Sequence, residues 1–124
     1  MAQFKVLLVD DEEEFAFALA ERLQMRGLDT KIVHNGEQAL FMVQDYVPEV
    51  VLLDLKMPGM DGLEVLRRVK KTHPQVQVVI LTGHGSQKDA EIARRLGAFA
   101  YLQKPADISE IVDTLKRAYS GSDG

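Results

Sequence analysis

The sequence predicts an α/β fold of five β–α pairs: a five-stranded parallel sheet in the flavodoxin-like order 2-1-3-4-5, with helices on both faces. Short apolar runs alternate with longer amphipathic segments five times along the 124 residues. Most runs are rich in Val, Leu and Ile and scarcely alternate with polar residues, which is typical of strands buried on both faces. Right-handed crossovers between such strands give a three-layer sandwich. Periodicity alone does not fix the strand order.

The run at 30–33 is the least apolar of the expected strands, and we expect it at an edge of the sheet. The first helix carries an apolar residue at every fourth position and ends at Gly27. Asp61 and Glu64 form a capping-box pattern for the third helix. The expected strands cover residues 4–9, 30–33, 50–53, 76–81 and 98–102. The other helices begin at Asn35, Ser86 and Asp107, and Pro48, Pro74 and Gly97 follow helix ends.

Composition excludes several classes of function. Fifteen basic and 19 acidic residues give a net charge of -4, and the chain has no basic run. It is therefore a poor candidate for binding nucleic acid by itself. The absence of cysteine excludes disulfides, thiolate chemistry and Cys-type zinc sites. No apolar run approaches the roughly 18 residues that span a bilayer. We therefore expect a cytoplasmic domain at 1–119, followed at 120–124 by a flexible tail or the start of a linker.

Polar side chains follow the expected strands at the carboxyl edge of the sheet. An acidic run at 10–14 follows the first strand, and Asp54 follows the third. Thr82 ends the fourth strand, and Lys104 follows the fifth. Because ligand sites in such sheets lie beyond the carboxyl ends of the strands, we expect these groups to converge.

The chemistry of this group favours a divalent cation and a phosphoryl group. Carboxylates gathered in one pocket repel one another, and oxygen-only ligands favour a hard ion such as Mg²⁺. With that ion present, one of these carboxylates can act as a nucleophile and form an aspartyl phosphate. Lys104 would place a positive charge near the phosphoryl oxygens, and Thr82 would donate a hydrogen bond to one of them.

Four segments at strand ends carry a family resemblance: Val9–Asp11, Leu53–Gly62, Leu81–Gly83 and Gly97–Pro105. Each is weak by itself, but their order and joint placement are specific. Over essentially its whole length, the chain resembles the receiver domains of bacterial two-component response regulators. The resemblance implies a phosphorylation switch that is not a conventional enzyme, with a histidine kinase or phosphotransfer protein as donor.

The resemblance also assigns roles to single residues. It implies that Asp54 is the phosphoacceptor, that Asp11 and Asp54 ligate Mg²⁺, and that Asp10 acts mainly through water. The backbone carbonyl of Lys56 would complete the protein ligands.

For the output, the resemblance implies that Thr82 and Lys104 bind the phosphoryl group. Thr82 and Tyr101 would couple phosphorylation to the face formed by helix 4, strand 5 and helix 5. That face would act on a partner, an effector domain or a second copy of the chain. The Lys104–Pro105 peptide bond would be cis.

Lys56 and His84 border the expected site and distinguish this chain. They lie two residues after Asp54 and Thr82, where receivers vary, and we hypothesise that they tune the lifetime of the phosphate. The alternative is that both are ordinary solvated loop residues.

The acidic residues at 12–14 have a structural explanation, since they complement the dipole at the start of a helix. We assign no role to His34 or His73.

Three rival functions remain to be weighed. A haloacid-dehalogenase-type phosphatase would need a second Asp two residues after its nucleophile, where this chain has Lys56. A flavin-binding protein would need a Ser/Thr/Gly-rich phosphate loop in place of the acidic run at 10–14. A receiver-like interaction module that is never phosphorylated finds no support in the sequence. The sequence names neither the kinase nor an output domain.

Overall fold

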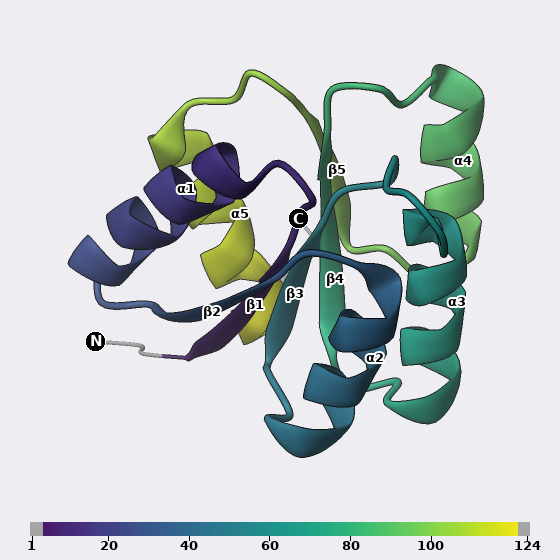
Figure 1. The fold of residues 1–124 in the computed structure, drawn as a ribbon, viewed down its shortest axis with the longest axis horizontal. Coiled ribbons are helices and arrows are strands. Elements are labelled where there is room, and N and C mark those ends of the chain that lie inside the picture. The colour runs from purple at the N-terminus through teal and green to yellow at the C-terminus, as the bar shows by residue number, and fades with distance from the viewer. Residues whose placement is uncertain (1–3, 122–124) are drawn as a thin grey trace.

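The structure, a computed structural model, describes residues 4–121. Its five strands form one parallel sheet in the order β2-β1-β3-β4-β5, which confirms the expected fold class and strand order (Figure 1). The strands are β1 (Lys5–Val9), β2 (Asp29–Val33), β3 (Val50–Leu53), β4 (Gln77–Thr82) and β5 (Ala100–Gln103). The helices are α1 (Glu13–Met25), α2 (Gly36–Asp45), α3 (Gly62–Thr72), α4 (Gln87–Arg95) and α5 (Ile108–Ser120).

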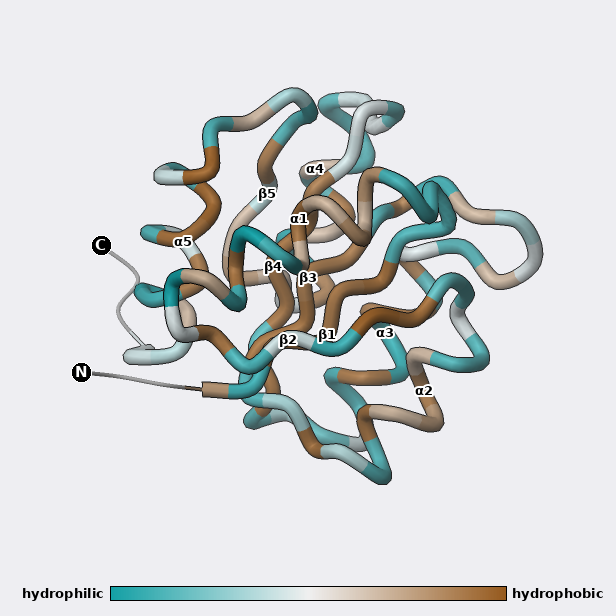
Figure 2. Tube along the Cα trace, turned by 60° about the vertical axis from the view of Figure 1, so that its left-hand side comes forward, coloured by the Kyte–Doolittle hydropathy of each residue, from teal (hydrophilic) through white to brown (hydrophobic). Residues whose placement is uncertain are grey.

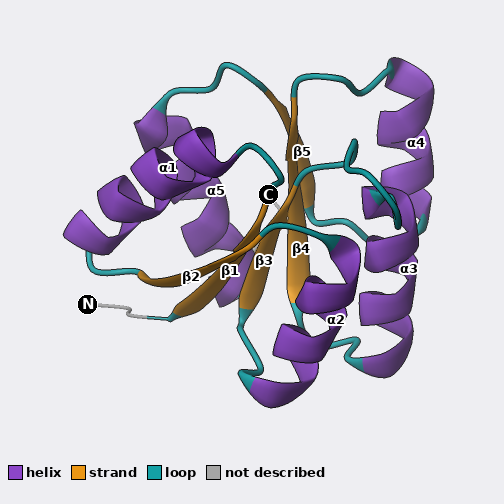
Figure 3. Cartoon of the chain, viewed as in Figure 1, coloured by secondary structure: helices purple, strands orange, loops and turns teal. Residues whose placement is uncertain are grey.

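The sheet separates two hydrophobic cores. Helices α1 and α5 cover one face, and α2, α3 and α4 cover the other (Figure 3). Because side chains alternate along a strand, Val6 and Leu8 of β1 enter the core under α1 and α5, whereas Leu7 and Val9 enter the opposite core. The central strands are accordingly hydrophobic stretches of the chain (Figure 2). The edge position expected for the run at 30–33 is confirmed by β2.

Most of the expected helix starts have the expected caps. The side chain of Asn35 accepts a hydrogen bond from the amide of Gln38 at the start of α2. At α4, Ser86 and Asp89 form a complete capping box, in which each side chain accepts from the other residue's amide. Asp107 occupies the cap position of α5 without a side-chain cap bond.

The capping box expected at α3 forms only by half. Asp61 accepts a hydrogen bond from the amide of Glu64, as expected. The carboxylate of Glu64 does not return to the cap residue, because it bonds the guanidinium groups of Arg67 and Arg68 on the same helix. Ion pairing along the helix surface therefore replaces the second half of the box.

At the C-terminus, α5 includes Ser120, one residue beyond the boundary expected at 119, and Gly121 ends it in the left-handed conformation with φ 77°. The rest of the expected tail, 122–124, lies outside the described residues. Over residues 4–121, no helix is long and apolar enough to cross a membrane.

Candidate functional site

Four polar side chains meet at the carboxyl rim of the sheet. Asp10 and Asp54 follow the adjacent strands β1 and β3, Thr82 ends β4, and Lys104 follows β5. The parallel register aligns Val9 with Leu53, so the two aspartates that follow them come side by side. Asp10 and Asp54 are 1% and 2% exposed, so this rim buries charge that most proteins leave in water.

Asp54 is held by donors on one side of its carboxylate. Its Oδ1 accepts hydrogen bonds from Thr82 Oγ1 at 2.7 Å and from the amide of Lys56 at 3.3 Å. Its Oδ2 makes no hydrogen bond within the described residues, and Lys104 Nζ lies 3.6 Å away. One oxygen is thus fixed, and the other remains available for chemistry next to a cation.

Glycine and apolar residues after β3 set the position of Asp54. Gly62 begins α3 so close to the strand end that a Cβ there would collide with the carbonyl oxygen of Asp54 and lie 2.6 Å from Leu55 Cα. Gly62 therefore serves a close backbone approach. The side chains of Leu55 and Met57 are buried and anchor the loop in the core.

Lys104 is the central cation of the rim. Its Nζ lies 2.8 Å from Asp10 Oδ2 and 2.8 Å from Glu12 Oε1, and 4.1 Å from the centroid of the Phe15 ring. Burial by itself would lower the pKa of Lys104, but the hydrogen bonds to Asp10 and Glu12 outweigh it and raise the pKa. Lys104 is therefore charged at neutral pH. The peptide bond between Lys104 and Pro105 is cis.

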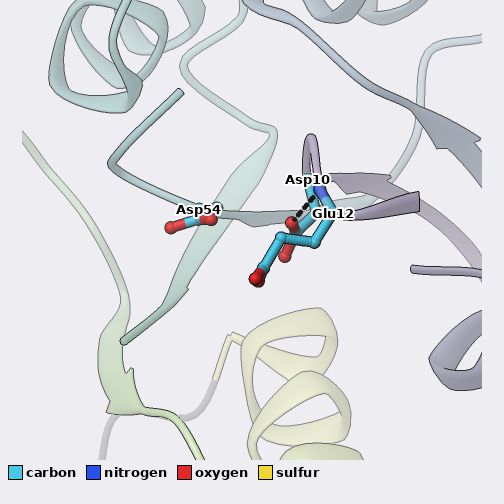
Figure 4. A group of neighbouring side chains, drawn as sticks. All are labelled: Asp10, Glu12 and Asp54. Atoms are coloured by element: carbon cyan, nitrogen blue, oxygen red, sulfur yellow. Dashed lines mark hydrogen bonds between the residues drawn. The ribbon is translucent and has the colours of Figure 1, made fainter. Parts of the chain in front are cut away.

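Three carboxylates form a compact acidic cluster around this lysine. Asp10, Glu12 and Asp54 each place one oxygen within 4.8 Å of the others (Figure 4). Burial raises the pKa of Asp10 despite its bond to Lys104, whereas the hydrogen bond from Lys104 lowers the pKa of Glu12. A single ammonium leaves this cluster with an excess of negative charge. Its oxygen-only donors and its charge fit a hard divalent cation such as Mg²⁺.

The acidic residues of the β1–α1 turn are placed differently from one another. Glu12, expected only to complement the helix dipole, occupies the N-terminal cap position of α1 without a cap bond and points its carboxylate at Lys104. No local signal in the sequence reveals this pairing, because Lys104 lies 92 residues away. Asp11 is half-buried and lies outside the three-carboxylate cluster. Its ligand role stays a prediction, as does that of the Lys56 carbonyl.

Asp54 borders a solvent-open depression of about 420 Å³. Lys56 and His84, which we expect to distinguish this chain, both line it. The exposed Lys56 ammonium lies 3.8 Å from Asp89 Oδ2 on α4, and the amide of His84 donates to Thr82 Oγ1 at 3.3 Å. The lining residues are Asp11, Glu12, Asp54, Lys56 and His84.

Tyr101 lies beneath the loop that follows β4. Its hydroxyl is buried and has no hydrogen-bond partner in the described part of the chain. Burial raises the pKa of the phenol. A Cβ built at Gly85 would coincide with this hydroxyl and lie 2.9 Å from Thr82 Cγ2, so Gly85 leaves the space that Tyr101 fills. Tyr101 thereby approaches Thr82, the residue to which we expect it to be coupled.

The sequence is similar to known proteins over nearly its whole length. The sequence profile described as "Response regulator receiver domain" matches residues 6–116. The chain is 39% identical over 117 residues to the Sporulation initiation phosphotransferase F of Bacillus subtilis, with 94% of each chain covered. It is 40% identical over 115 residues to the DNA-binding transcriptional regulator NtrC of Salmonella typhimurium, which covers 93% of this chain and 24% of that protein. The chain therefore spans about a quarter of the length of this relative.

Solved structures give the same result. NtrX from Brucella abortus superposes with a TM-score of 0.90 at 32% identity, over 97% of this chain and 28% of that chain. A CheY-like receiver domain protein from Methanospirillum hungatei superposes with a TM-score of 0.92 over 97% of this chain and 96% of that one. At 23% identity the latter supports the fold alone.

Proposed function

This chain belongs to the family of response regulator receiver domains, and we propose that it is a switch controlled by phosphorylation of Asp54. The donor is a histidine kinase or phosphotransfer protein in the cytoplasm, and the output is a partner, an effector domain or a second copy of the chain. The observation that carries the proposal is a buried carboxylate with one oxygen held by Thr82 and the other facing Lys104.

In the proposed reaction, Asp54 Oδ2 attacks the phosphorus of the donor's phosphohistidine. An oxygen–phosphorus bond forms, the phosphorus–nitrogen bond breaks, and the electron pair returns to the imidazole of the donor. Lys104, 3.6 Å from Oδ2, stabilises the charge on the phosphoryl oxygens. The hydroxyl of Thr82 turns from Asp54 Oδ1 to one of those oxygens. Hydrolysis later resets the carboxylate, so the protein is consumed and restored with each signal.

We propose that Asp11, Asp54 and the Lys56 carbonyl hold Mg²⁺, with Asp10 acting through water. The ion would neutralise the oxygens of the transferring group. We include Glu12 among the carboxylates around the ion, because one of its oxygens lies within the same three-carboxylate cluster.

The output is proposed to pass from Thr82 to Tyr101. Phosphorylation adds about -1.5 to -2 charge units next to Asp54 and draws the Thr82 hydroxyl away from its present partner. Tyr101, packed against the same loop, then follows and stabilises one arrangement of the face formed by α4, β5 and α5. The phosphate thus biases an equilibrium between two forms.

Lys56 and His84 are proposed to tune the phosphate lifetime, because both line the solvent-open depression that Asp54 borders. Lys56→Ala and His84→Ala are each expected to change the hydrolysis half-life without preventing phosphorylation. The half-life is measured by intact-protein mass after the donor is removed. Unchanged half-lives in both variants would sink this part of the proposal.

The test of the whole proposal is intact-protein mass after addition of acetyl phosphate, with Mg²⁺ or with EDTA. We expect a Mg²⁺-dependent gain of one phosphoryl group, about 80 Da, in the native chain and none in Asp54→Asn. Asp61→Asn, which alters an exposed aspartate of the same loop, is the matched control and should gain the group. A purified histidine kinase is the second donor, for the case that acetyl phosphate does not react. An adduct that survives in Asp54→Asn would overturn the assignment.

A further inference from the structure

His34 contacts the acidic turn from the neighbouring strand. It follows β2, and its ring Nδ1 lies 2.9 Å from the backbone carbonyl oxygen of Asp10. The residue before it, Val33, accepts a hydrogen bond from the amide of Asp10 at 3.1 Å. Both backbone groups of Asp10 are therefore bonded to the end of β2.

The chemistry of this contact fixes the role of the ring. A carbonyl oxygen can only accept a hydrogen bond, so Nδ1 must carry the proton and donate. His34 is itself held in place, because its amide donates to Gln38 Oε1 at 3.1 Å and the next residue, Asn35, caps α2. The donor thus belongs to a turn that is fixed at both of its ends.

The position of the Asp10 backbone sets the direction of its carboxylate. Asp10 Oδ1 accepts from the amide of Glu12 at 2.9 Å, and Oδ2 accepts from Lys104 Nζ at 2.8 Å. A rotation of the Asp10 peptide would disturb both bonds and move Asp11 and Glu12 with it. Hydrogen bonds that orient the residues around a metal, without touching the metal, commonly influence the affinity of the site.

We propose that His34 is a positioning residue, which fixes the acidic turn 10–12 for Mg²⁺ by donating a hydrogen bond to the Asp10 carbonyl. The inference rests on the proposed function, because the bound Mg²⁺ is part of that proposal. It makes β2, the edge strand that supplies no ligand, a contributor to the site.

The test compares two substitutions of His34, one that removes the hydrogen-bond donor and one that keeps a donor. His34→Phe keeps a ring but has no donor, whereas the amide nitrogen of His34→Asn can occupy the place of Nδ1. We expect the dissociation constant for MgCl₂, measured by calorimetry, to rise about ten-fold in His34→Phe and to stay near the native value in His34→Asn. His73→Phe, at the far end of α3, is the matched control and should bind as the native chain does. His34→Leu replaces the Phe variant if the latter does not fold.

A second readout needs no metal. Hydrogen exchange at the amide of Glu12, which is bonded to Asp10 Oδ1, should accelerate in His34→Phe and return to the native rate in His34→Asn. An unchanged dissociation constant and exchange rate in His34→Phe would overturn the proposal, as would equal loss in both variants.

The same experiments separate this inference from the proposed function. If the native chain neither binds MgCl₂ nor gains a phosphoryl group, the proposed function fails, and the claim that His34 serves a metal fails with it. If the native chain does both and His34→Phe matches it in affinity and exchange, only the role of His34 is lost. At saturating Mg²⁺, His34→Phe should still be phosphorylated on Asp54.

Discussion

At the amino end of the sheet, charged groups lie in water against aromatic rings, whereas at the carboxyl end they lie buried among one another. The ammonium groups of Lys5 and Lys31 lie 5.1 and 5.3 Å from the centroid of the Tyr46 ring. Phe4 stacks on Tyr119 nearby, with 4.4 Å between ring centroids. Lys5 and Lys31 are exposed, so their ammonium groups can stay in water while they lie against the ring, which is a low-cost way to place charge on a protein surface.

At the carboxyl end, by contrast, the charged groups of Asp10, Asp54 and Lys104 are largely buried. Removing carboxylates and an ammonium from water costs several kcal/mol per ion, and apolar residues of similar size would often be at least as stable. The difference between the two ends teaches that stability does not account for the buried charges. The proposed phosphorylation would account for them, because it needs a nucleophile, a fixed cation and a site for a divalent ion in one place.

The largest expected effect comes from replacing Lys104 at the carboxyl end, compared with replacing Lys31 at the amino end. Lys104→Met leaves the buried Asp10 without its cation, so we expect the free energy of unfolding to fall by about 3 kcal/mol. Lys31→Met removes only an exposed contact with Tyr46 and should cost about 0.5 kcal/mol. Urea denaturation in EDTA at neutral pH measures both. Mg²⁺ should return part of the loss in Lys104→Met and none in Lys31→Met. Equal losses in the two variants would contradict the contrast between the two ends of the sheet.

Within the carboxyl end, two glycines of one loop allow a finer test. Gly85→Ala places a methyl group where the buried hydroxyl of Tyr101 lies, so the partly buried ring must move. Gly83→Ala is the matched control, because its Cβ would lie 3.6 Å from Lys104 Cβ, an ordinary contact.

We expect Gly85→Ala to cost about 1–2 kcal/mol and to return the pKa of Tyr101 toward its ordinary value, because the burial that raises it is lost. The pKa is measured by NMR titration of ¹³C-labelled tyrosine. Phosphorylation of Asp54 should persist while the output changes. A Tyr101 pKa that stays raised in Gly85→Ala would show that the ring keeps its place by another route.

The sequence predicts those parts of the fold and site that depend on short-range patterns. Apolar runs define the strands, and the side chain of Asn35 caps its helix as expected. Asp54 and Lys104 come together because parallel strands end at one edge, which the topology guarantees once the strand order is known. The residues that follow the strands were therefore predictable as a group.

Pairings between distant side chains were not predictable in the same way. Glu12 looks like any acidic residue at a helix start until Lys104 is placed beside it. The contact of Lys56 with Asp89 depends on where α4 lies relative to the loop after β3. The inward position of Tyr101 depends on a missing side chain at Gly85, and an absence of atoms leaves no periodic signal.

The smallest expected effect concerns a surface group of three charges at the same end of the sheet: Glu64, Arg67 and Arg68. Hydrogen bonds from Arg67 and Arg68 lower the pKa of Glu64 from 4.5 to about 2. Between these values the folded chain binds fewer protons than the unfolded chain, so the stabilisation is fully present above pH 4.5 and is lost as the pH falls toward 2.

Glu64→Gln should therefore lower the free energy of unfolding slightly at pH 7, and the difference from the native chain should shrink below pH 4.5. Urea denaturation at several pH values measures that difference, and NMR titration of the carboxyl carbon measures the pKa. Glu91→Gln, on the exposed surface of α4, controls for the loss of a negative charge. A loss in Glu64→Gln as large as that in Lys104→Met would mean that pairing alone stabilises this end of the sheet. A small loss would support burial as the difference, since Glu64 and Lys104 each have two close oppositely charged partners but the side chain of Glu64 is the more exposed of the two.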